Sequence, residues 1–333
     1  MQGKVAIEEH FVTPELAGTI FGSIGWDPRE WQAMADCLQE TDEVRLAAMD
    51  AGGIEMSVLS LAAPCIQDEY DTQRAIERSV HANDALAEIV ARHPDRYAGL
   101  AALPLQDPVA AADELERSVS ELGFCGALVN GWSSVGDLDT AAYYDEPQYL
   151  EFWERVASLD VPIYLHPRNP LPNERRLYEG REELLGPTWA FTVETATHAL
   201  RLITSGLFDR YPSLTVILGH LGELLPFAVD RTRQRLSRIP GLRLERTATE
   251  YLRENFFVTT SGNFHTTSLL GVIEMVGAER VMFSVDYPFE EVSDATEWFD
   301  AAPIEEETRR LIGRENAMRL LGLSLADATA PAG

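Results

Sequence analysis

Two stretches at opposite ends of the sequence carry residues that can bind a metal ion. The apolar run 5–7 leads into Glu8 and His10, and the apolar run 281–285 leads into Asp286. In α/β folds the functional side chains follow the carboxyl ends of parallel strands. We therefore predict that the two ends of the chain meet in space around one metal ion.

Other apolar runs also end in polar side chains, namely Asn130, His166 and His220. Glu8 and His10 are two residues apart, so on an extended strand they point to the same face. Two imidazoles and two carboxylates form a mixed nitrogen and oxygen site that suits Zn²⁺, Mn²⁺ or Fe²⁺. The alternative is that these polar groups only satisfy the backbone of loops.

His220 is followed three residues later by Glu223. If a helix begins just beyond, Glu223 fixes the tautomer and charge of the imidazole, and the two form a polar dyad that faces the metal. The alternative is a helix entry with Glu223 merely near a positive helix N-terminus. Arg231 follows on the same helix and points either to the site or to solvent.

The pattern of apolar runs predicts how these residues are positioned. Strand-like runs alternate with helical patterns, which favours a parallel sheet. Eight such strands predict a (β/α)8 TIM barrel, with a doubly wound open sheet as the alternative, although no glycine-rich nucleotide motif follows any strand. The predicted strands are 4–8, 55–60, 97–103, 125–130, 162–166, 214–219, 256–260 and 281–286.

Capping residues and the spacing of apolar residues predict four helices. They cover 71–92, the segment that begins at Asp107 and Pro108, 192–205 and 223–235. We predict one barrel domain over residues 1–323, with 324–333 as a loose tail. Three segments are long for barrel loops, 11–39, 131–148 and 167–187. The first carries Phe11, Phe21, Trp26 and Trp31 and is predicted to fold over the barrel mouth as a lid.

Composition excludes several classes of function. The net charge is −27 without a basic cluster, which argues against nucleic-acid binding. No apolar run reaches the length of a membrane span, and no signal peptide is visible, so a cytoplasmic location without a membrane partner is expected. The three cysteines form no CxxC pair, which is typical of reduced thiols.

Lys4 is the only lysine in the chain. A pyridoxal-phosphate or Schiff-base enzyme needs a lysine in its active site, and Lys4 lies at the wrong end of its predicted strand. A dinuclear site bridged by a carbamylated lysine is excluded for the same reason. The metal site should therefore hold a single ion.

Eight motifs across residues 1 to 320 carry a resemblance to a known family. The sequence resembles the metal-dependent aromatic-acid decarboxylases of the amidohydrolase superfamily, and His10 favours the branch that acts on γ-resorcylate (2,6-dihydroxybenzoate). Trp132 and Tyr287 depart from the residues usual in that branch. The matching segments are 8–11, 102–108, 126–131, 164–170, 186–191, 219–223, 259–264 and 286–290.

The resemblance implies a (β/α)8 barrel, a single Mn²⁺ or Zn²⁺ and a homodimer or homotetramer. It implies substrate contacts from Asn130 and Arg231 and a supporting role for His220 with Glu223. Phe289 and Trp189 belong to the matched motifs and are predicted to contact the substrate as well. The implied metal ligands are Glu8, His10, His166 and Asp286.

The predicted activity is the non-oxidative decarboxylation of an ortho-hydroxybenzoate, a small aromatic acid. Loss of CO₂ from an aryl ring is difficult unless the ring carbon is protonated first, and we predict that Asp286 delivers that proton. No organic cofactor is expected. One alternative keeps the same site but hydrolyses a lactone or an amide. A second alternative is a protein that binds aromatic acids without turnover.

Overall fold

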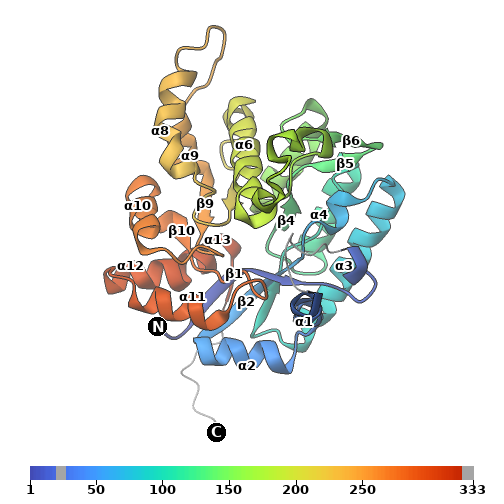
Figure 1. Ribbon diagram of the computed structural model, residues 1–333, viewed down its shortest axis with the longest axis vertical. Helices are drawn as coiled ribbons and strands as arrows, with labels where there is room; N and C mark the ends of the chain where they lie inside the picture. Colours follow the sequence, from blue (N-terminus) through green and yellow to red (C-terminus); the bar gives the residue numbers. More distant parts are fainter. Residues whose placement is uncertain (20–27, 325–333) are drawn as a thin grey trace.

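Eight parallel strands surround a common axis in the computed structural model, which describes residues 1–19 and 28–324 (Figure 1). Hydrogen bonds join the strands in the orders β1-β2-β3 and β10-β9-β8-β7-β4. The strands are β1 (Lys4–Phe11), β2 (Ile54–Leu61), β3 (Tyr97–Gly99), β4 (Ala127–Asn130), β7 (Ile163–His166), β8 (Val216–Leu218), β9 (Phe256–Thr259) and β10 (Val281–Met282).

A few backbone hydrogen bonds close each of the two seams between these groups of strands. Ala101, just after β3, donates to the carbonyl of Gly126 at 2.9 Å and accepts from Leu128 of β4 at 3.0 Å. At the other seam, Asp286 N donates to Glu8 O at 3.0 Å and His10 N donates to Tyr287 O at 2.7 Å. The predicted (β/α)8 barrel is therefore confirmed.

Helices cover the outside of the barrel, and β5 (Ser133–Val135) and β6 (Asp137–Ala142) form an antiparallel hairpin after β4 (Figure 1). None of the described helices is long and apolar enough to cross a membrane. The helices are α1 (Pro28–Gln39), α2 (Glu43–Gly52), α3 (Thr72–Arg92), α4 (Pro108–Ser120), α5 (Leu150–Leu159), α6 (Ala190–Thr204), α7 (Leu207–Arg210), α8 (Leu225–Leu236), α9 (Ala248–Asn255), α10 (Thr266–Val276), α11 (Val292–Ala301), α12 (Glu306–Arg310) and α13 (Asn316–Leu321).

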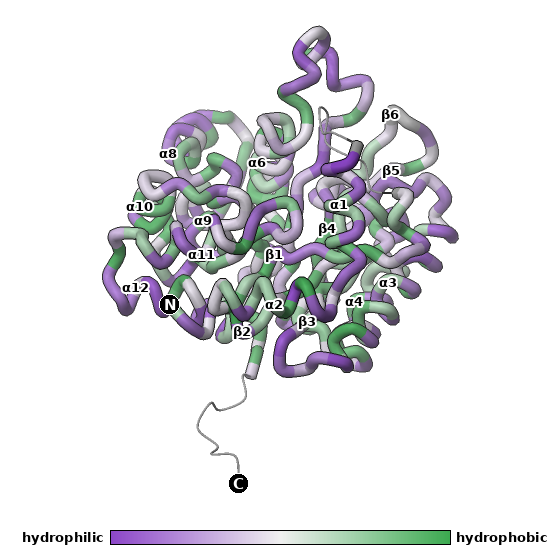
Figure 2. The backbone as a smooth tube through the Cα atoms, turned by 60° about the horizontal axis from the view of Figure 1, so that its bottom comes forward, coloured by the Kyte–Doolittle hydropathy of each residue, from purple (hydrophilic) through white to green (hydrophobic). Residues whose placement is uncertain are grey.

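The start of α4 illustrates how capping residues set these boundaries. The Asp107 side chain accepts hydrogen bonds from Val109 N and Ala110 N, and Pro108 occupies the first turn, where its missing N–H costs nothing. Ala112 and Leu115 then lie buried on the face that packs inward. Figure 2 shows the complementary pattern, with the outer helix α12 largely hydrophilic.

The last predicted strand is shorter than expected. The ladder of β10 ends at Met282 because the next N–H groups bond outside it, beginning with Phe283 N, which donates to the backbone carbonyl of Ile312 at 2.8 Å. Ser284 N donates to Thr260 Oγ1 and Val285 N donates to Glu9 Oε1, both at 2.9 Å. This irregular segment carries the chain to Asp286, whose φ of 82° lies in the left-handed region.

The lid prediction is wrong for one of its residues. Phe11 belongs to β1 and is fully buried, so it is part of the core. Phe21 and Trp26 lie outside the described residues. Trp31 lies on α1, which borders a cavity of about 600 Å³ with Pro288 and Phe289 on the other side. The first long loop thus contributes a helix to the mouth of the barrel.

Lys4 lies at the amino-terminal end of β1, away from Glu8 and His10. Its buried ammonium group donates to Gly52 O and to Asp300 Oδ2, both at 3.0 Å. Asp300 also pairs with the N-terminal amine of Met1 at 2.7 Å. The lysine is therefore a structural cation.

Candidate metal centre

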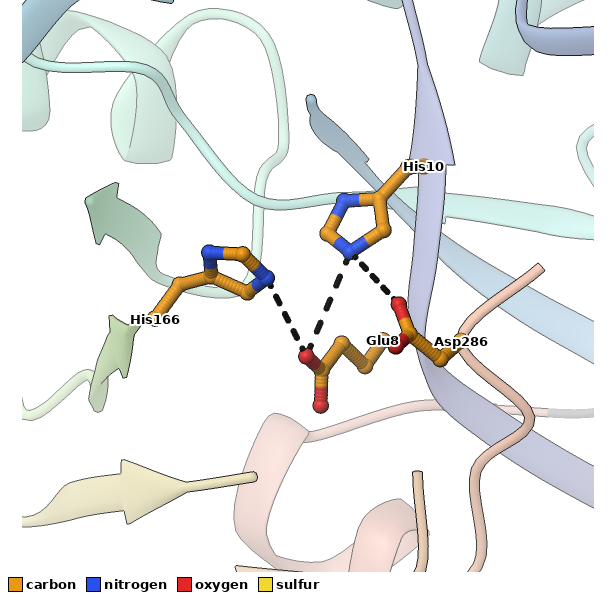
Figure 3. A group of neighbouring side chains, drawn as sticks. All are labelled: Glu8, His10, His166 and Asp286. Carbon is orange, nitrogen blue, oxygen red and sulfur yellow. Dashed lines mark ion pairs between the residues drawn. The ribbon is translucent and has the colours of Figure 1, made fainter. Parts of the chain in front are cut away.

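The structure brings the four predicted ligands together at the carboxyl end of the barrel strands. One donor atom from each of Glu8, His10, His166 and Asp286 lies within 4.8 Å of the others. His10 Nε2 lies 3.1 Å from Asp286 Oδ1, and His166 Nε2 lies 3.3 Å from Glu8 Oε1. Figure 3 shows both imidazole rings and both carboxylates directed toward one centre.

Hydroxyl groups from β7 and from the end of β9 fix the orientation of Glu8. Its Oε2 accepts hydrogen bonds from Tyr164, Ser261 and Thr259, the last at 3.3 Å. This leaves Oε1 to face the cluster. Gly219 permits the arrangement, because a Cβ at this position would approach Glu8 Oε2 to 2.9 Å.

Each ligating imidazole has a partner for its other nitrogen. His166 Nδ1 lies 3.1 Å from the carbonyl of Pro167, which can only accept, so Nδ1 carries the proton and Nε2 presents a lone pair. His10 Nδ1 lies 3.3 Å from Ser60 Oγ. Such outer partners are the usual way in which proteins orient histidine ligands.

Three of the four donor atoms of this cluster have no hydrogen-bond partner in the described part of the chain. Glu8 Oε1, His10 Nε2 and Asp286 Oδ1 are all buried without a hydrogen bond. Leaving one such group unpaired costs about 1–3 kcal/mol. A divalent cation at their centre satisfies all of them, and two imidazoles with two carboxylates suit Mn²⁺ or Zn²⁺.

The electrostatics of His166 and Asp286 favour the protonation states that bind a metal, whereas those of Glu8 do not. Burial lowers the pKa of His166 well below its usual value, and His10 lowers it further, so the imidazole is neutral. Burial alone would raise the pKa of Asp286, but the nearby His10 and His220 outweigh it and hold that pKa below its usual range. Burial raises the pKa of Glu8, and repulsion from Asp286 adds to the effect. A bound cation would relieve that repulsion.

His220 and Glu223 lie in a left-handed turn between β8 and α8. All five residues from 220 to 224 have φ between 53° and 80°, and four of them are not glycine. Such a run is costly for L-residues and is typical of functional sites. It also explains why the predicted helix 223–235 begins only at Leu225.

The turn places the His220 ring between a carboxylate partner and the cluster. His220 Nδ1 lies 2.6 Å from Glu223 Oε1, and its Nε2 lies 3.5 Å from Asp286 Oδ2. Thr192 donates to the other oxygen of Glu223 at 2.8 Å. Burial alone would lower the pKa of His220, but the carboxylates of Glu223 and Glu8 outweigh it and hold that pKa well above its usual value.

Two further predicted residues lie beside the cluster. Asn130 is buried and pairs in register with His166 on the neighbouring strand, so both side chains point to the same side of the sheet. The Phe289 ring meets His10 edge to face, with centroids 5.6 Å apart, and borders the cavity next to α1.

Arg231 and Trp189 are not brought to the cluster of their own chain. Arg231 is exposed on α8, six residues and about 9 Å along the helix axis from Leu225. Trp189 is 46% exposed at the start of α6. Among the described residues, neither side chain makes a hydrogen bond or ion pair with the cluster.

Sequence reasoning missed the hydroxyl groups that hold Glu8. Tyr164 stands two residues before His166 on the same strand, so its direction was accessible from the strand period. Thr259 and Ser261 show the same spacing at the end of the seventh barrel strand. That strand end was left without an assigned residue because hydroxyl groups are less conspicuous than metal ligands.

Comparison with known proteins agrees with this geometry. The amidohydrolase family matches residues 10–323. The chain belongs to this family. It is 52% identical to a γ-resorcylate decarboxylase from Rhizobium radiobacter, over 97% of this chain and 99% of that protein.

Two solved structures resemble this amidohydrolase closely. A 2,6-dihydroxybenzoate decarboxylase in complex with 2,6-dihydroxybenzoate superposes with a TM-score of 0.93 at 51% identity, over 97% of this chain and 100% of that one. A dihydroxybenzoic acid decarboxylase from Polaromonas sp. JS666, with bound manganese and the inhibitor 2-nitroresorcinol, gives a TM-score of 0.91 at 49% identity, over 97% of each chain.

Proposed function

We propose that this amidohydrolase is a metal-dependent decarboxylase of ortho-hydroxybenzoates, with 2,6-dihydroxybenzoate as its preferred type of substrate. The observation that carries the proposal is the cluster of Glu8, His10, His166 and Asp286, whose donor atoms lie close together and of which three are buried without a hydrogen bond among the described residues. Relatives that are half identical over nearly the whole chain bear the name of this activity.

The residues of the chain supply orientation and proton transfer. When bound, a divalent ion supplies Lewis acidity that holds the carboxylate and the ortho oxygen of the acid and favours the phenolate. Phe289, whose ring meets that of His10, would pack against the ring of the bound acid. The aromatic ring itself takes up the electron pair, which is why the reaction requires no organic cofactor.

Asp286 is the proposed proton donor to the ring. Because its pKa is held low, Asp286 is ionised before the acid binds and takes its proton from the substrate's own hydroxyl group. It then delivers that proton to the ring carbon that bears the carboxylate. The C–C bond breaks, CO₂ leaves, and its electron pair restores the aromatic ring. His220, 3.5 Å from Asp286 and held by Glu223, is positioned to stabilise the carboxylate that remains.

Arg231 supports the proposal of a homo-oligomer. Its exposed position on α8, in the part of the molecule that projects from the barrel in Figure 1, leaves it outside the site of its own chain. A substrate contact from Arg231 therefore requires a second copy that presents α8 to this barrel. Phe227 and Leu224, which are 54% and 45% exposed on and next to the same helix, supply an apolar surface for such a contact. Trp189 would likewise contact the substrate in the barrel of a second copy.

We also propose a cytoplasmic location, which the three free cysteines support.

Asp286→Asn tests the activity directly. The metal-loaded wild type should release CO₂ from 2,6-dihydroxybenzoate, and chelation followed by dialysis should abolish the release until Mn²⁺ or Zn²⁺ is restored. The kcat of the variant should be lower by about 10²–10⁴-fold or more, since a positioned acid usually contributes a factor of this size. It should still bind some metal and ligand, as calorimetry would show.

Acid release from a lactone without CO₂ release would favour a hydrolase, and ligand binding without any turnover would favour a binding protein.

A further inference from the structure

Gln67 stands next to the site, in the turn of residues Cys65–Asp68 that follows β2, and is 1% exposed. Its side-chain amide lies between two backbone groups. Nε2 donates to the carbonyl of Leu103 at 2.8 Å, and Oε1 accepts from the backbone N–H of Asn130 at 3.2 Å. A carbonyl can only accept and a backbone N–H can only donate. Only one orientation of the Gln67 amide satisfies both.

This orientation determines how the Asn130 side chain must point. Gln67 Oε1 can meet only a donor, so Asn130 turns its Nδ2 toward it, at 3.2 Å. Asn130 Oδ1 is then the free end of the amide. It is buried, and it has no hydrogen-bond partner among the described residues. Because Asn130 lies in register with His166, this unpartnered acceptor stands on the cluster's side of the sheet.

Arg168 makes the arrangement rigid. Its Nη1 donates to the backbone carbonyls of Gln67 at 2.9 Å and of Trp132 at 2.6 Å. Its guanidinium group also lies over the Trp132 ring, 3.5 Å from the centroid. Arg168 thus ties the turn that carries Gln67 to the segment that follows Asn130. The side-chain amides of Gln67 and Asn130 are held together by these two hydrogen bonds of Arg168.

We propose that Gln67 is a positioning residue that locks Asn130 as a hydrogen-bond acceptor, and that Asn130 Oδ1 selects acids with a second, protonated ring hydroxyl. The inference rests on the proposed function and specifies the substrate class. An ortho-hydroxybenzoate would direct its carboxylate and one ortho oxygen toward the metal centre. A second hydroxyl group offers the donor that Oδ1 lacks, whereas an acid without it leaves Oδ1 buried and unpaired. A site built in this way discriminates strongly against the analogue that lacks the hydroxyl.

Gln67→Leu, compared with Gln106→Leu, tests this inference. Gln106 is a matched control, since its Nε2 donates to Ile66 O and Glu69 O and so holds the same turn, but it makes no hydrogen bond to Asn130. Two ratios would be measured on metal-loaded protein. One is kcat/KM for 2,6-dihydroxybenzoate over 2-hydroxybenzoate, and the other is the Kd of 2-nitrophenol over that of 2-nitroresorcinol.

The wild type and Gln106→Leu should prefer the dihydroxy compound in both ratios by more than about tenfold. Gln67→Leu frees the Asn130 amide to turn, so both ratios should fall roughly tenfold. Gln67→Glu, with its buried carboxyl protonated, can donate to Leu103 O and still accept from both N–H groups of Asn130, so it should retain most of the preference. A global loss of structure would lower kcat/KM for both acids and weaken the binding of both nitro compounds by the same factor, so the two ratios would stay unchanged.

Gln67→Leu that keeps the urea midpoint of the wild type and also its two ratios would overturn the inference. The inference would also be overturned if the wild-type protein bound 2-nitrophenol and 2-nitroresorcinol with equal Kd. This second test does not depend on the folding of any variant. Failure of the proposed function is distinct, because then no hydroxybenzoate would release CO₂ while the binding ratio could still be measured.

Discussion

The two ends of β1 show opposite solutions to the burial of charge. At the amino-terminal end, the Lys4 ammonium group is surrounded by acceptors and paired with Asp300. At the carboxyl-terminal end, Glu8 and His10 direct unpaired atoms toward Asp286 and His166. One end is complete within the chain, and the other is complete only with a cation. In β1, unsatisfied polar atoms mark the functional end of the strand.

Removing a charge from the functional end should have the largest effect. Glu8→Gln should weaken metal binding by more than about 100-fold, beyond the loss typical of outer partners. The metal-free protein should be no less stable than the wild type, because a buried carboxylate with a raised pKa is replaced by a neutral amide. Metal titration and urea unfolding of the metal-free proteins measure the two quantities.

Glu9→Gln is the matched control for this prediction. Glu9 is the next residue and equally buried, but its carboxylate bonds to Ser284 Oγ and Val285 N and not to the cluster. The variant should keep metal affinity within several-fold of the wild type. An equal loss of affinity in both variants would mean that strand position, and not ligation by Glu8, controls the site.

Removing the Lys4 charge at the amino-terminal end of β1 should lower the unfolding free energy and leave the activity intact. Lys4→Met leaves the carbonyl of Gly52 without a donor and removes one of the two cationic partners of Asp300, which should cost about 1–3 kcal/mol of unfolding free energy. Arg74→Met removes an exposed ion pair with Asp71 and should cost less than about 1 kcal/mol. Urea unfolding gives both values, and kcat/KM should stay near the wild type. A large loss of activity in folded Lys4→Met would remove the contrast between the two ends.

The smallest effect is expected from a buried histidine outside the cluster. Burial, helped by Arg201, lowers the pKa of His198 to about 3, while an unfolded histidine titrates near about 6.5. The unfolded chain therefore binds a proton that the folded chain refuses, and the stability present above pH 6.5 is lost as the pH falls from there toward 3. Between pH 7 and 5.5 this loss should be about 1 kcal/mol.

His198→Gln should remove this pH-dependent part, since the glutamine oxygen can still accept the hydrogen bond from Tyr144 N. The exposed His81→Gln variant is the control and should follow the wild-type pH dependence. Urea midpoints at the two pH values provide the comparison. A wild-type slope in His198→Gln would show that other groups cause the acid sensitivity.

The sequence predicted those parts of the site that follow from strand periodicity. Glu8 and His10 share a face because they are two residues apart, and His166 and Asp286 follow apolar runs. The same rule would have found Tyr164. The left-handed turn at 220–224 was not predictable, because four of its five residues carry side chains that disfavour this conformation. Nor does helix spacing reveal whether Arg231 serves its own chain. The loose tail at 324–333 stays a prediction, since 325–333 lie outside the described residues.

The hydrogen bond from Asp286 N to Glu8 O joins the first barrel strand to the segment after the last. During synthesis, a ribosome must therefore release nearly the entire polypeptide before any ion can be captured with full affinity. Truncated or nascent chains would lack the pocket altogether, so metal loading should be among the final events in the maturation of this enzyme.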